Sequence, residues 1–535
     1  MTPRYSVITP VYNPPPDVLR ACIESVRNQW LGDWQLCLVD DASTAPGVHE
    51  VLRDAAAIDR RIEVRYRDRN GGIVEASNDA LEMATGTWVA FLDHDDLLTP
   101  HALAAVDAIV ETDETIDYCY SDEDHIDRGG RFFDPFHKPD WSPERLRSQN
   151  YTCHLSVMRR SLVDEVGRFR HGFDGAQDYD LILRVTERAR RVEHAQQVLY
   201  HWRMGEGSTS GDATSKPYAY EAGRRAVADH CARVGIDAEV EPGAILGVQR
   251  LRRRVHGEPL VSIVIPTRGS VGRVWGVDRI FVIDAVRSVV ERSTYQHVEI
   301  VVVADVAMDP AIVTELDALA GDRLRVVWYD KPFNFSDKVN VGALAATGDL
   351  LLFLNDDIEV IDADWLETMV AIAQEDDVGA VGARLLFADG TLQHAGHLYN
   401  GGPTHIFGGR GGDEIGPSGL LVVQREVSGV TAACLMTRRE VFESVGGFTT
   451  SLPENFNDVD FCLKLRHRDL RIVYTPYASL HHFESQTRVP LVKQFEIDFI
   501  MARWAHPLAV DPYSNPNFAH DRNDWVVQPP VDVYR

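Results

Sequence analysis

The chain has 535 residues, of which 44% are hydrophobic and 25% are charged, a composition typical of soluble globular proteins. Its length is too great for one hydrophobic core and suits two domains of about 250 residues each. The formal net charge of −27 argues against nucleic acid as a partner, because an acidic surface repels a phosphate backbone.

Targeting and redox signals are sparse. The seven cysteines form no CxxC pair, which favours reduced thiols over a disulfide framework. No signal peptide is recognisable, and no apolar run reaches the roughly 18 residues of a transmembrane helix. We therefore expect a cytoplasmic protein with no transmembrane segment, for which peripheral association with the inner face of the plasma membrane is one option. Arg250 and Arg252–Arg254 form either a solvated strand edge or a contact for lipid head groups or a diphosphate-linked acceptor.

In the first half, short apolar strands alternate with amphipathic helices. Strands are predicted at 5–9, 36–39 and 88–92. Helices are predicted at 18–26 and at 73–84, where Gly86 is expected to cap the carboxyl end. Continuous apolar strands separated by helices predict a mostly parallel sheet that is covered on both faces.

The second half repeats this order. Strands are predicted at 261–265, 299–303 and 350–354, and a helix at 336–346 is closed by Gly348. A helix at 218–234 and a strand-like connector at 245–255 separate the halves, so we expect domains of residues 1–255 and 256–535. The glycine-dense stretch 401–419 suggests a mobile flap, and the irregular stretch 511–518 is expected to pack against the body.

Acidic residues and a histidine follow the strands in the same order in both halves. The first set is Asp41, Asp93-His94-Asp95-Asp96, Asp178 and His201, and the second is Asp305, Asn355-Asp356-Asp357, Asp458 and His482. Asp41 and Asp95 are 54 residues apart, and Asp305 and Asp357 are 52 apart. The distances along the chain from Asp95 to Asp178 and from Asp357 to Asp458 are 83 and 101 residues, and those from there to His201 and His482 are 23 and 24. Ligands bind beyond the carboxyl ends of parallel strands, where both acidic clusters fall. Two ordered sets indicate two copies of one catalytic domain.

Each set contains groups that can hold a cation and activate a hydroxyl. Asp93 and Asp95 stand one residue apart at a strand end and suit a hard divalent cation such as Mn²⁺ or Mg²⁺. Asp178 begins a predicted helix and is either a general base or only a helix cap. His201 is either structural or a further metal ligand, and Arg203 could hold phosphate oxygens.

A third histidine-rich pattern lies in the second half. His394 and His397, followed by His405, could suggest a zinc site. No cysteine or acidic residue stands at ligand spacing beside them, so a loop that faces the acceptor is the favoured interpretation.

With these residues in place, the chain resembles glycosyltransferase family 2, the inverting enzymes of the GT-A fold. The first half carries the resemblance in SVITPVYNPP, CLVDDAST, NGGIVEASNDALEMATGTWVAFLDHDD, GAQDYDLILRV and LYHWRMGEGSTS. The second half carries it in VSIVIPTRG, FNFSDKVNVGALAATGDLLLFLNDDIEV, GARLLFADGTLQHAGH, GVTAACLMTRREVFESVGGF and NDVDFCLKLRHRDLRIVYTPYASLHHFES. It implies an α/β protein with two GT-A domains in tandem, each a Rossmann-like, mostly parallel sheet flanked by helices. Similar tandem chains assemble bacterial surface polysaccharides, including rhamnose-containing ones.

The resemblance also implies residue roles. Asp178 and Asp458 would be the catalytic bases. The metal ligands would be Asp93, Asp95, His201, Asp357 and His482, with Mn²⁺ or Mg²⁺ as the ion. The nucleotide-sugar-binding residues would be Pro10, Tyr12, Asp41, Asp93, Arg203, Pro266, Arg268, Asp305, Asn355 and Asp356. The implied donor is a UDP- or dTDP-sugar, and the implied acceptor is an oligosaccharide or a lipid-linked glycan.

The second half departs from the pattern at three positions. Asn355 replaces the first acid of the pair, Ala304 replaces the acid before Asp305, and Arg268 stands where the first half has Tyr12. An insertion at 269–280 also lengthens its first loop. These changes suit either a different donor or a weaker site.

Three functions are compatible with these patterns. The leading hypothesis is a bifunctional transferase in which each domain adds one sugar. The second keeps one catalytic domain and makes the other, more readily the C-terminal one, a glycan- or nucleotide-binding module. The third is a sugar nucleotidyltransferase, but the first loop lacks the glycines and lysine that would hold a triphosphate.

Overall fold

The computed structural model describes residues 3–204, 217–483 and 492–528. The chain divides into two compact units, which are considered separately. Unit 1 comprises Met1–Trp141 and Leu146–Leu251, and unit 2 comprises Ser142–Arg145 and Arg252–Arg535. The main division, after Leu251, lies close to the boundary expected from the sequence. The motif residues 205–210 and 484–485 lie outside the described ranges.

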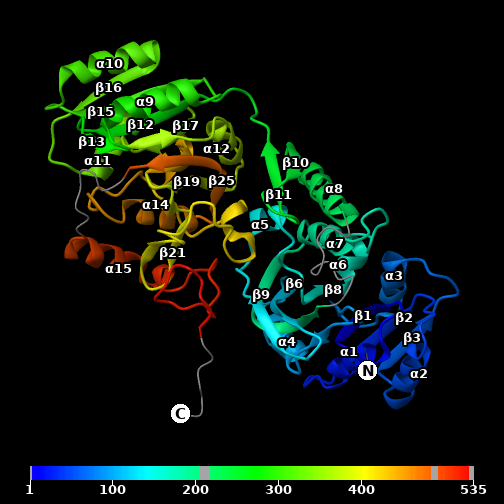
Figure 1. The fold of residues 1–535 in the computed structure, drawn as a ribbon. Coiled ribbons are helices and arrows are strands. Elements are labelled where there is room, and N and C mark those ends of the chain that lie inside the picture. Colours follow the sequence, from blue (N-terminus) through cyan, green and yellow to red (C-terminus); the bar gives the residue numbers. More distant parts are fainter. Residues whose placement is uncertain (1–2, 205–216, 484–491, 529–535) are drawn as a thin grey trace. The chain divides into compact units, whose positions relative to one another are not determined.

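Unit 1 is built on one large sheet (Figure 1). In spatial order its strands are β3 (Ile62–Tyr66), β2 (Trp34–Asp40), β1 (Tyr5–Val11), β4 (Trp88–Phe91), β8 (Ser156–Arg159), β6 (Ile116–Ile126), β9 (Arg191–Arg203) and β5 (Leu97–Leu98), and β7 (Phe132–Phe136) pairs with β6. The strands from β3 to β4 are parallel, β8 is reversed, and β6 and β9 are again parallel to each other. The expected mostly parallel sheet is therefore confirmed.

Helices cover both faces of this sheet. One core contains apolar residues of α1 (Pro16–Arg27), α2 (Val48–Ile58) and α4 (Ala102–Val110). The other contains residues of α3 (Ile73–Met83), α6 (Arg160–Glu165), α7 (Gln177–Thr186) and α8 (Pro217–Val234). The short helix α5 (Pro143–Ser148) and the pair β10 (Ala238–Pro242) and β11 (Gln249–Arg253) complete this part of the chain.

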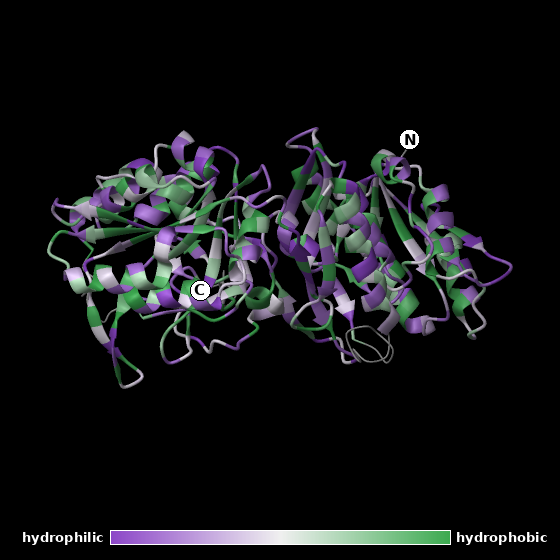
Figure 2. Cartoon of the chain, turned by 90° about the horizontal axis from the view of Figure 1, so that it is seen from above, coloured by the Kyte–Doolittle hydropathy of each residue, from purple (hydrophilic) through white to green (hydrophobic). Residues whose placement is uncertain are grey.

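Unit 2 repeats the arrangement. Its sheet follows the order β16 (Leu324–Tyr329), β15 (Val298–Asp305), β12 (Val261–Thr267), β17 (Leu350–Leu354), β24 (Cys434–Arg438), β19 (Val378–Leu386), β25 (Arg471–His482) and β18 (Ile358–Val360), with β20 (Leu392–His394) beside β19 and β23 (Arg425–Glu426) beside β25. One face is covered by α9 (Phe281–Arg292), α10 (Pro310–Ala320) and α12 (Trp365–Ala373), and the other by α11 (Phe335–Ala345), α13 (Arg439–Ser444) and α14 (Asn457–Arg466). Hydrophobic and hydrophilic segments alternate in both units, and several of the strands are drawn in green (Figure 2).

Two segments that seemed irregular in the sequence have defined structure. The insertion at 269–280 forms a hairpin of β13 (Val271–Val274) and β14 (Val277–Ile280), and part of the glycine-dense stretch forms β22 (Pro403–His405) against β21 (His397–Tyr399). A last helix, α15 (Gln494–Ala509), precedes the tail. The tail packs against the body, as predicted, because Asp511 accepts a 2.8 Å hydrogen bond from the Tyr399 amide. Within the described ranges, no helix combines the length and the apolar character needed to span a bilayer.

The expected helix-capping role of Gly86 and Gly348 is wrong. The residue after α3 is Ala84 and the residue after α11 is Ala346, and both are extended. A Cβ on Gly86 would lie 2.8 Å from the Ser6 nitrogen, and one on Gly348 would collide with the Leu260 carbonyl oxygen. Glycine is needed here because two backbone segments approach each other closely, a reason that helix patterns do not reveal.

Candidate active site

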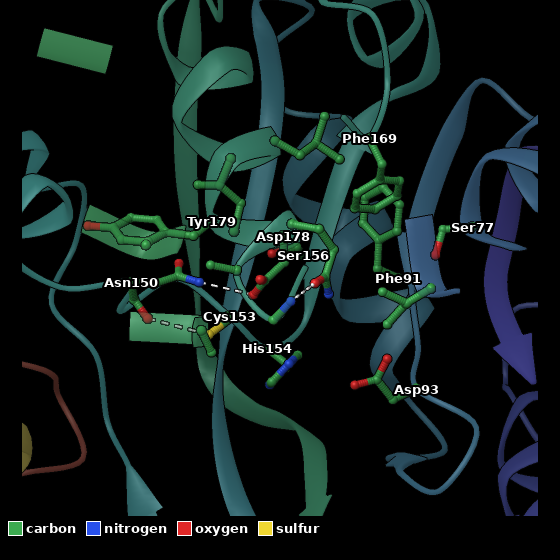
Figure 3. A pocket seen from close by; sticks show the side chains of 18 of the residues that line it. Ser77, Phe91, Asp93, Asn150, Cys153, His154, Ser156, Phe169, Asp178 and Tyr179 are labelled. Atoms are coloured by element: carbon green, nitrogen blue, oxygen red, sulfur yellow. Dashed lines mark hydrogen bonds between the residues drawn. The ribbon is translucent and has the colours of Figure 1, made fainter. Parts of the chain in front are cut away.

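A pocket of about 680 Å³ opens in unit 1 (Figure 3). It is bounded by the ends of β1 and β4, the segment before β8, and the first turn of α7. Three carboxylates from distant parts of the chain line it: Asp93, Asp95 and Asp178. Pro10, which follows the strand predicted at 5–9 and lies within β1, lines it as well.

The carboxylates of Asp93 and Asp95 have no hydrogen-bond or ion-pair partner among the described residues. Burial raises the pKa of Asp93, and the nearby charge of Asp95 adds to that effect while His154 opposes it. Two neighbouring carboxylates without a direct ion-pair partner repel each other and match the oxygen ligands of a hard divalent cation. The residues present therefore fit a Mn²⁺ or Mg²⁺ ion.

Asp178 is the second residue of α7 and is held by one neighbour. The amide nitrogen of Asn150 donates a 3.0 Å hydrogen bond to Oδ2 of Asp178 (Figure 3). None of the sequence motifs identified Asn150 as a site residue, because it lies in the irregular segment before β8. With Oδ2 engaged, Oδ1 remains to accept a proton from a bound hydroxyl.

The imidazole beside these carboxylates belongs to His154, which the sequence did not single out. Its ring stacks on Tyr200 at 4.7 Å, and its Nδ1 lies 3.0 Å from Oε2 of Glu123. Burial lowers the pKa of His154, but Glu123, together with Asp93 and Asp96, outweighs this and raises the pKa to about 9. His154 thus adds positive charge to an acidic pocket.

The structure does not bring His201 to the pocket. Its Nδ1 is hydrogen-bonded to Asp124, and its ring stacks on Phe132 with the centroids 4.0 Å apart. Trp202, the next residue, lines the pocket instead. Because successive side chains of a strand point to opposite faces, Trp202 faces the pocket and His201 points away from it.

Arg203 braces the loop after β4. Its Nε donates to the carbonyl oxygen of Asp95 and its backbone nitrogen to Oδ1 of Asp96, both at 2.7 Å. Arg203 is therefore adjacent to the carboxylate pair. Its guanidinium group, which was expected to hold phosphate, already donates one hydrogen bond to the backbone of Asp95.

Asp41 stands at the end of β2 and organises the loop before α3. Its two oxygens accept 2.8 Å hydrogen bonds from the amides of Gly71 and Gly72, and Arg67 lies 3.1 Å away. Tyr12, at the end of β1, is half-exposed. Asp41 does not line the pocket, so its role in binding a nucleotide-sugar stays a prediction.

In unit 2, three predicted residues meet. Nε2 of His482 lies 3.1 Å from Oδ1 of Asp357 and 3.1 Å from the amide nitrogen of Asn355. On the other side of the ring, Nδ1 is 2.6 Å from Oε1 of Gln393. Because the Gln393 oxygen can only accept a hydrogen bond, Nδ1 of His482 carries a proton. In neutral His482 the lone pair therefore lies on Nε2, which faces Asp357. This arrangement also fits a cation.

Asp458 is the second residue of α14, as Asp178 is of α7. Its Oδ2 accepts from the Ala432 amide at 3.2 Å and its Oδ1 from the Val459 amide at 2.8 Å.

Asp356 accepts a 2.6 Å hydrogen bond from Thr267, and burial, with the charge of Asp357, raises the pKa of Asp356 to about 7.

Asp305 differs from Asp41 in its partner. Nζ of Lys338, a buried residue of α11, lies 2.6 Å from Oδ1 of Asp305 and also donates to the carbonyl oxygen of Thr267. Pro266 lies near the end of β12. Arg268 follows this strand directly and donates a 2.9 Å hydrogen bond to Ser270. The only sequence signal for Lys338 was its place on a predicted helix, which does not reveal what it faces.

Strand register shows which residues of the two units correspond. His201 lies ten residues after the start of β9, and His481 lies ten residues after the start of β25. Each is paired with the ninth residue of the adjacent strand, β6 or β19. His201 therefore corresponds to His481, and Trp202 corresponds to His482. The same register places Ala433 of unit 2 at the position of His154.

Together, fold and site define a protein of two α/β units with acidic groups gathered at the strand ends. The chain belongs to glycosyl transferase family 2, which it matches over residues 6–167 and 262–446.

Several known proteins are similar to this chain. It is 42% identical over 546 residues to the uncharacterized protein y4gI of Sinorhizobium fredii, covering 99% of the chain and 59% of that protein. It is 38% identical over 530 residues to the O-antigen biosynthesis protein RfbC of Myxococcus xanthus, covering 98% of the chain and 41% of that protein. The chain thus spans only part of the length of both relatives. The crystal structure of S. aureus TarS 1–349 is 21% identical, covers 42% of the chain and 65% of that chain, and has a TM-score of 0.34.

Proposed function

We propose that the chain transfers sugars from UDP- or dTDP-sugars, with inversion and with a divalent metal ion, onto a glycan or glycolipid of a cell-surface polysaccharide. The observation that carries this proposal is the meeting of Asp93, Asp95 and Asp178 in one pocket at the strand ends of unit 1. The family match and the similarity to an O-antigen biosynthesis protein support the class of product.

The residues of unit 1 suit a single displacement. Asp178 takes the proton of the acceptor hydroxyl, whose oxygen forms the bond to the anomeric carbon as the bond to the diphosphate oxygen breaks. Asn150 keeps Asp178 oriented by its hydrogen bond to Oδ2. A divalent cation held by Asp93 and Asp95 would neutralise the departing diphosphate.

Unit 2 is proposed to be a second transferase. His482, Asp357 and Asn355 supply its cation site, and Asp458 corresponds to Asp178. An alternative is that unit 2 only binds a glycan or nucleotide. It is favoured by the ion pair between Asp305 and Lys338 and by the two amide hydrogen bonds that occupy both oxygens of Asp458.

Donor hydrolysis by the purified chain tests the proposal. UDP-glucose, UDP-galactose, UDP-galactofuranose and dTDP-rhamnose are each supplied with Mn²⁺ to the wild type and to Asp95→Ala and Asp357→Ala. Asp54→Asn and Asp317→Asn remove exposed carboxylates of α2 and α10 and serve as matched controls. If each test variant loses part of the turnover, both units are transferases. If Asp357→Ala keeps full activity, unit 2 is a binding module, and if no donor turns over even with an oligosaccharide acceptor, the proposal fails.

A further inference from the structure

Three histidines of unit 2 that the proposed reaction does not use lie together. His394 ends β20, His397 begins β21, and His405 ends β22, where His397 and His405 face each other across the hairpin. One ligand nitrogen from each ring lies within 4.8 Å of those of the other two. The ring centroids are 5.1, 4.9 and 5.1 Å apart and therefore form a nearly equilateral triangle.

We propose that His394, His397 and His405 bind a divalent transition-metal ion of the zinc class, with a fourth position open to water or to the acceptor. A tetrahedral ion about 2.0–2.1 Å from three imidazole nitrogens holds the ring centroids about 5 Å apart, as they are here. The rings are inclined to one another by 78°, 76° and 88°, so they do not stack.

The surroundings select the class of ion. His394 and His397 are only 1% and 3% exposed, whereas His405 is exposed and offers a route from solvent. Burial also lowers the pKa of His394 and His397, which keeps their rings in the uncharged form that binds metals. Three imidazoles without a carboxylate suit zinc, nickel or copper better than the oxygen-seeking Mg²⁺ and Mn²⁺.

A rival arrangement is a hydrogen-bonded chain of rings without metal. The Thr431 amide is 3.2 Å from Nε2 of His394, which places the proton of neutral His394 on Nδ1, 2.8 Å from Nδ1 of His405. An ion bound to Nδ1 of His394 would require the ring proton to move to Nε2, and His394 would then lose the Thr431 hydrogen bond. Metal analysis separates the two arrangements.

The cluster adjoins the proposed transfer site of unit 2. Gln393, next to His394, contacts His482, and the consecutive amides of Thr431 and Ala432 donate to His394 and Asp458. An ion bound here would fix the segment from 393 to 405 beside Asp458.

The test measures zinc held by the full chain. Protein stripped with a chelator is equilibrated with Zn²⁺, desalted and analysed for metal, and replacement by Co²⁺ is followed by visible absorption. We expect about one retained zinc per chain, the strong absorption of tetrahedral Co²⁺, and a zinc affinity at least about tenfold weaker in His405→Gln and His394→Gln.

Two control variants sharpen this test. His520→Gln removes another exposed histidine of unit 2 and should keep the zinc, as should Asp357→Asn, which alters the other cation site. His405→Gln changes an exposed side chain, so loss of zinc in this variant cannot be ascribed to misfolding. The proposal is overturned if the wild type retains no zinc, if His405→Gln holds as much as the wild type, or if Asp357→Asn alone removes it.

Discussion

Nε2 of His482 lies 3.1 Å from Oδ1 of Asp357 in unit 2, and no such contact exists at the corresponding position of unit 1 within the described ranges. Trp202 replaces His482 there, and His154, from the segment before β8, supplies the imidazole near Asp93. The two units thus place one imidazole beside their carboxylates from different segments of the chain.

This difference predicts unequal effects of two histidine substitutions. His154→Gln should shift the Mn²⁺ dependence of unit 1 activity about tenfold toward lower Mn²⁺ concentrations, because it removes a positive charge that would repel a cation beside Asp93. His201→Gln should leave that dependence nearly unchanged, since His201 contacts Asp124 and Phe132 instead. Activity is titrated with Mn²⁺ for both variants. A shift toward higher Mn²⁺ concentrations in His201→Gln would restore His201 as the metal ligand that the sequence indicates.

Asp178→Asn tests the proposed base of unit 1. The amide keeps the shape of the side chain but cannot accept the proton, so kcat should fall by about 10²–10⁴-fold with little change in the KM for the donor. Steady-state transfer to an oligosaccharide acceptor gives both constants. Asp54→Asn should behave as wild type, and an equal loss in that control would point to a general effect of carboxylate removal.

The close approach of backbones at two glycines predicts a shared stability defect. Gly86→Ala and Gly348→Ala should each destabilise their unit by about 1–3 kcal/mol, because the added methyl group overlaps the neighbouring strand. At Gly32, by contrast, a Cβ would meet its nearest atom, of Arg61, at 3.8 Å, so Gly32→Ala serves as the control. Urea unfolding measures all three. Wild-type stability of the Gly86 variant would show that the strands can separate without cost.

A buried carboxylate of unit 1 predicts a loss of stability in acid. Asp122 accepts hydrogen bonds from His137 at 3.0 Å, His194 at 2.8 Å and the Lys138 amide at 2.9 Å. Burial raises its pKa, but the two histidines outweigh burial and lower the pKa from 3.8 to about 2. Because the folded state has the lower pKa, the stabilisation is present above pH 3.8 and is lost as the pH falls toward 2.

The corresponding experiment compares the wild type with Asp122→Asn. At neutral pH the free energy of unfolding of the variant should be about 2 kcal/mol lower than that of the wild type, and this difference should become smaller as the pH falls below 4. Urea midpoints at a series of pH values provide the measurement. A gap that stays constant down to the acid limit would mean that the charge of Asp122 does not contribute.

Local patterns predicted most of the framework. The run from 350 to 354 is apolar throughout and forms β17 with those bounds, and the helix predicted at 73–84 is α3, Ile73–Met83. These predictions succeeded because hydrophobic periodicity reflects burial against a sheet, which holds along the whole element. The glycine caps failed because a cap is a local interpretation, whereas the strand that excludes a side chain at Gly86 lies 80 residues away in the sequence.

The sequence by itself determined the family, the two-fold repetition and the positions of the carboxylates at strand ends, because each is written in contiguous motifs. Only the tertiary structure decided which histidine meets those carboxylates. The gaps of 23 and 24 residues that pair His201 with His482 differ by one, and one residue along a strand turns a side chain to the opposite face. Folding also joined His394, His397 and His405, because three short strands bring together rings for which the sequence favoured another interpretation.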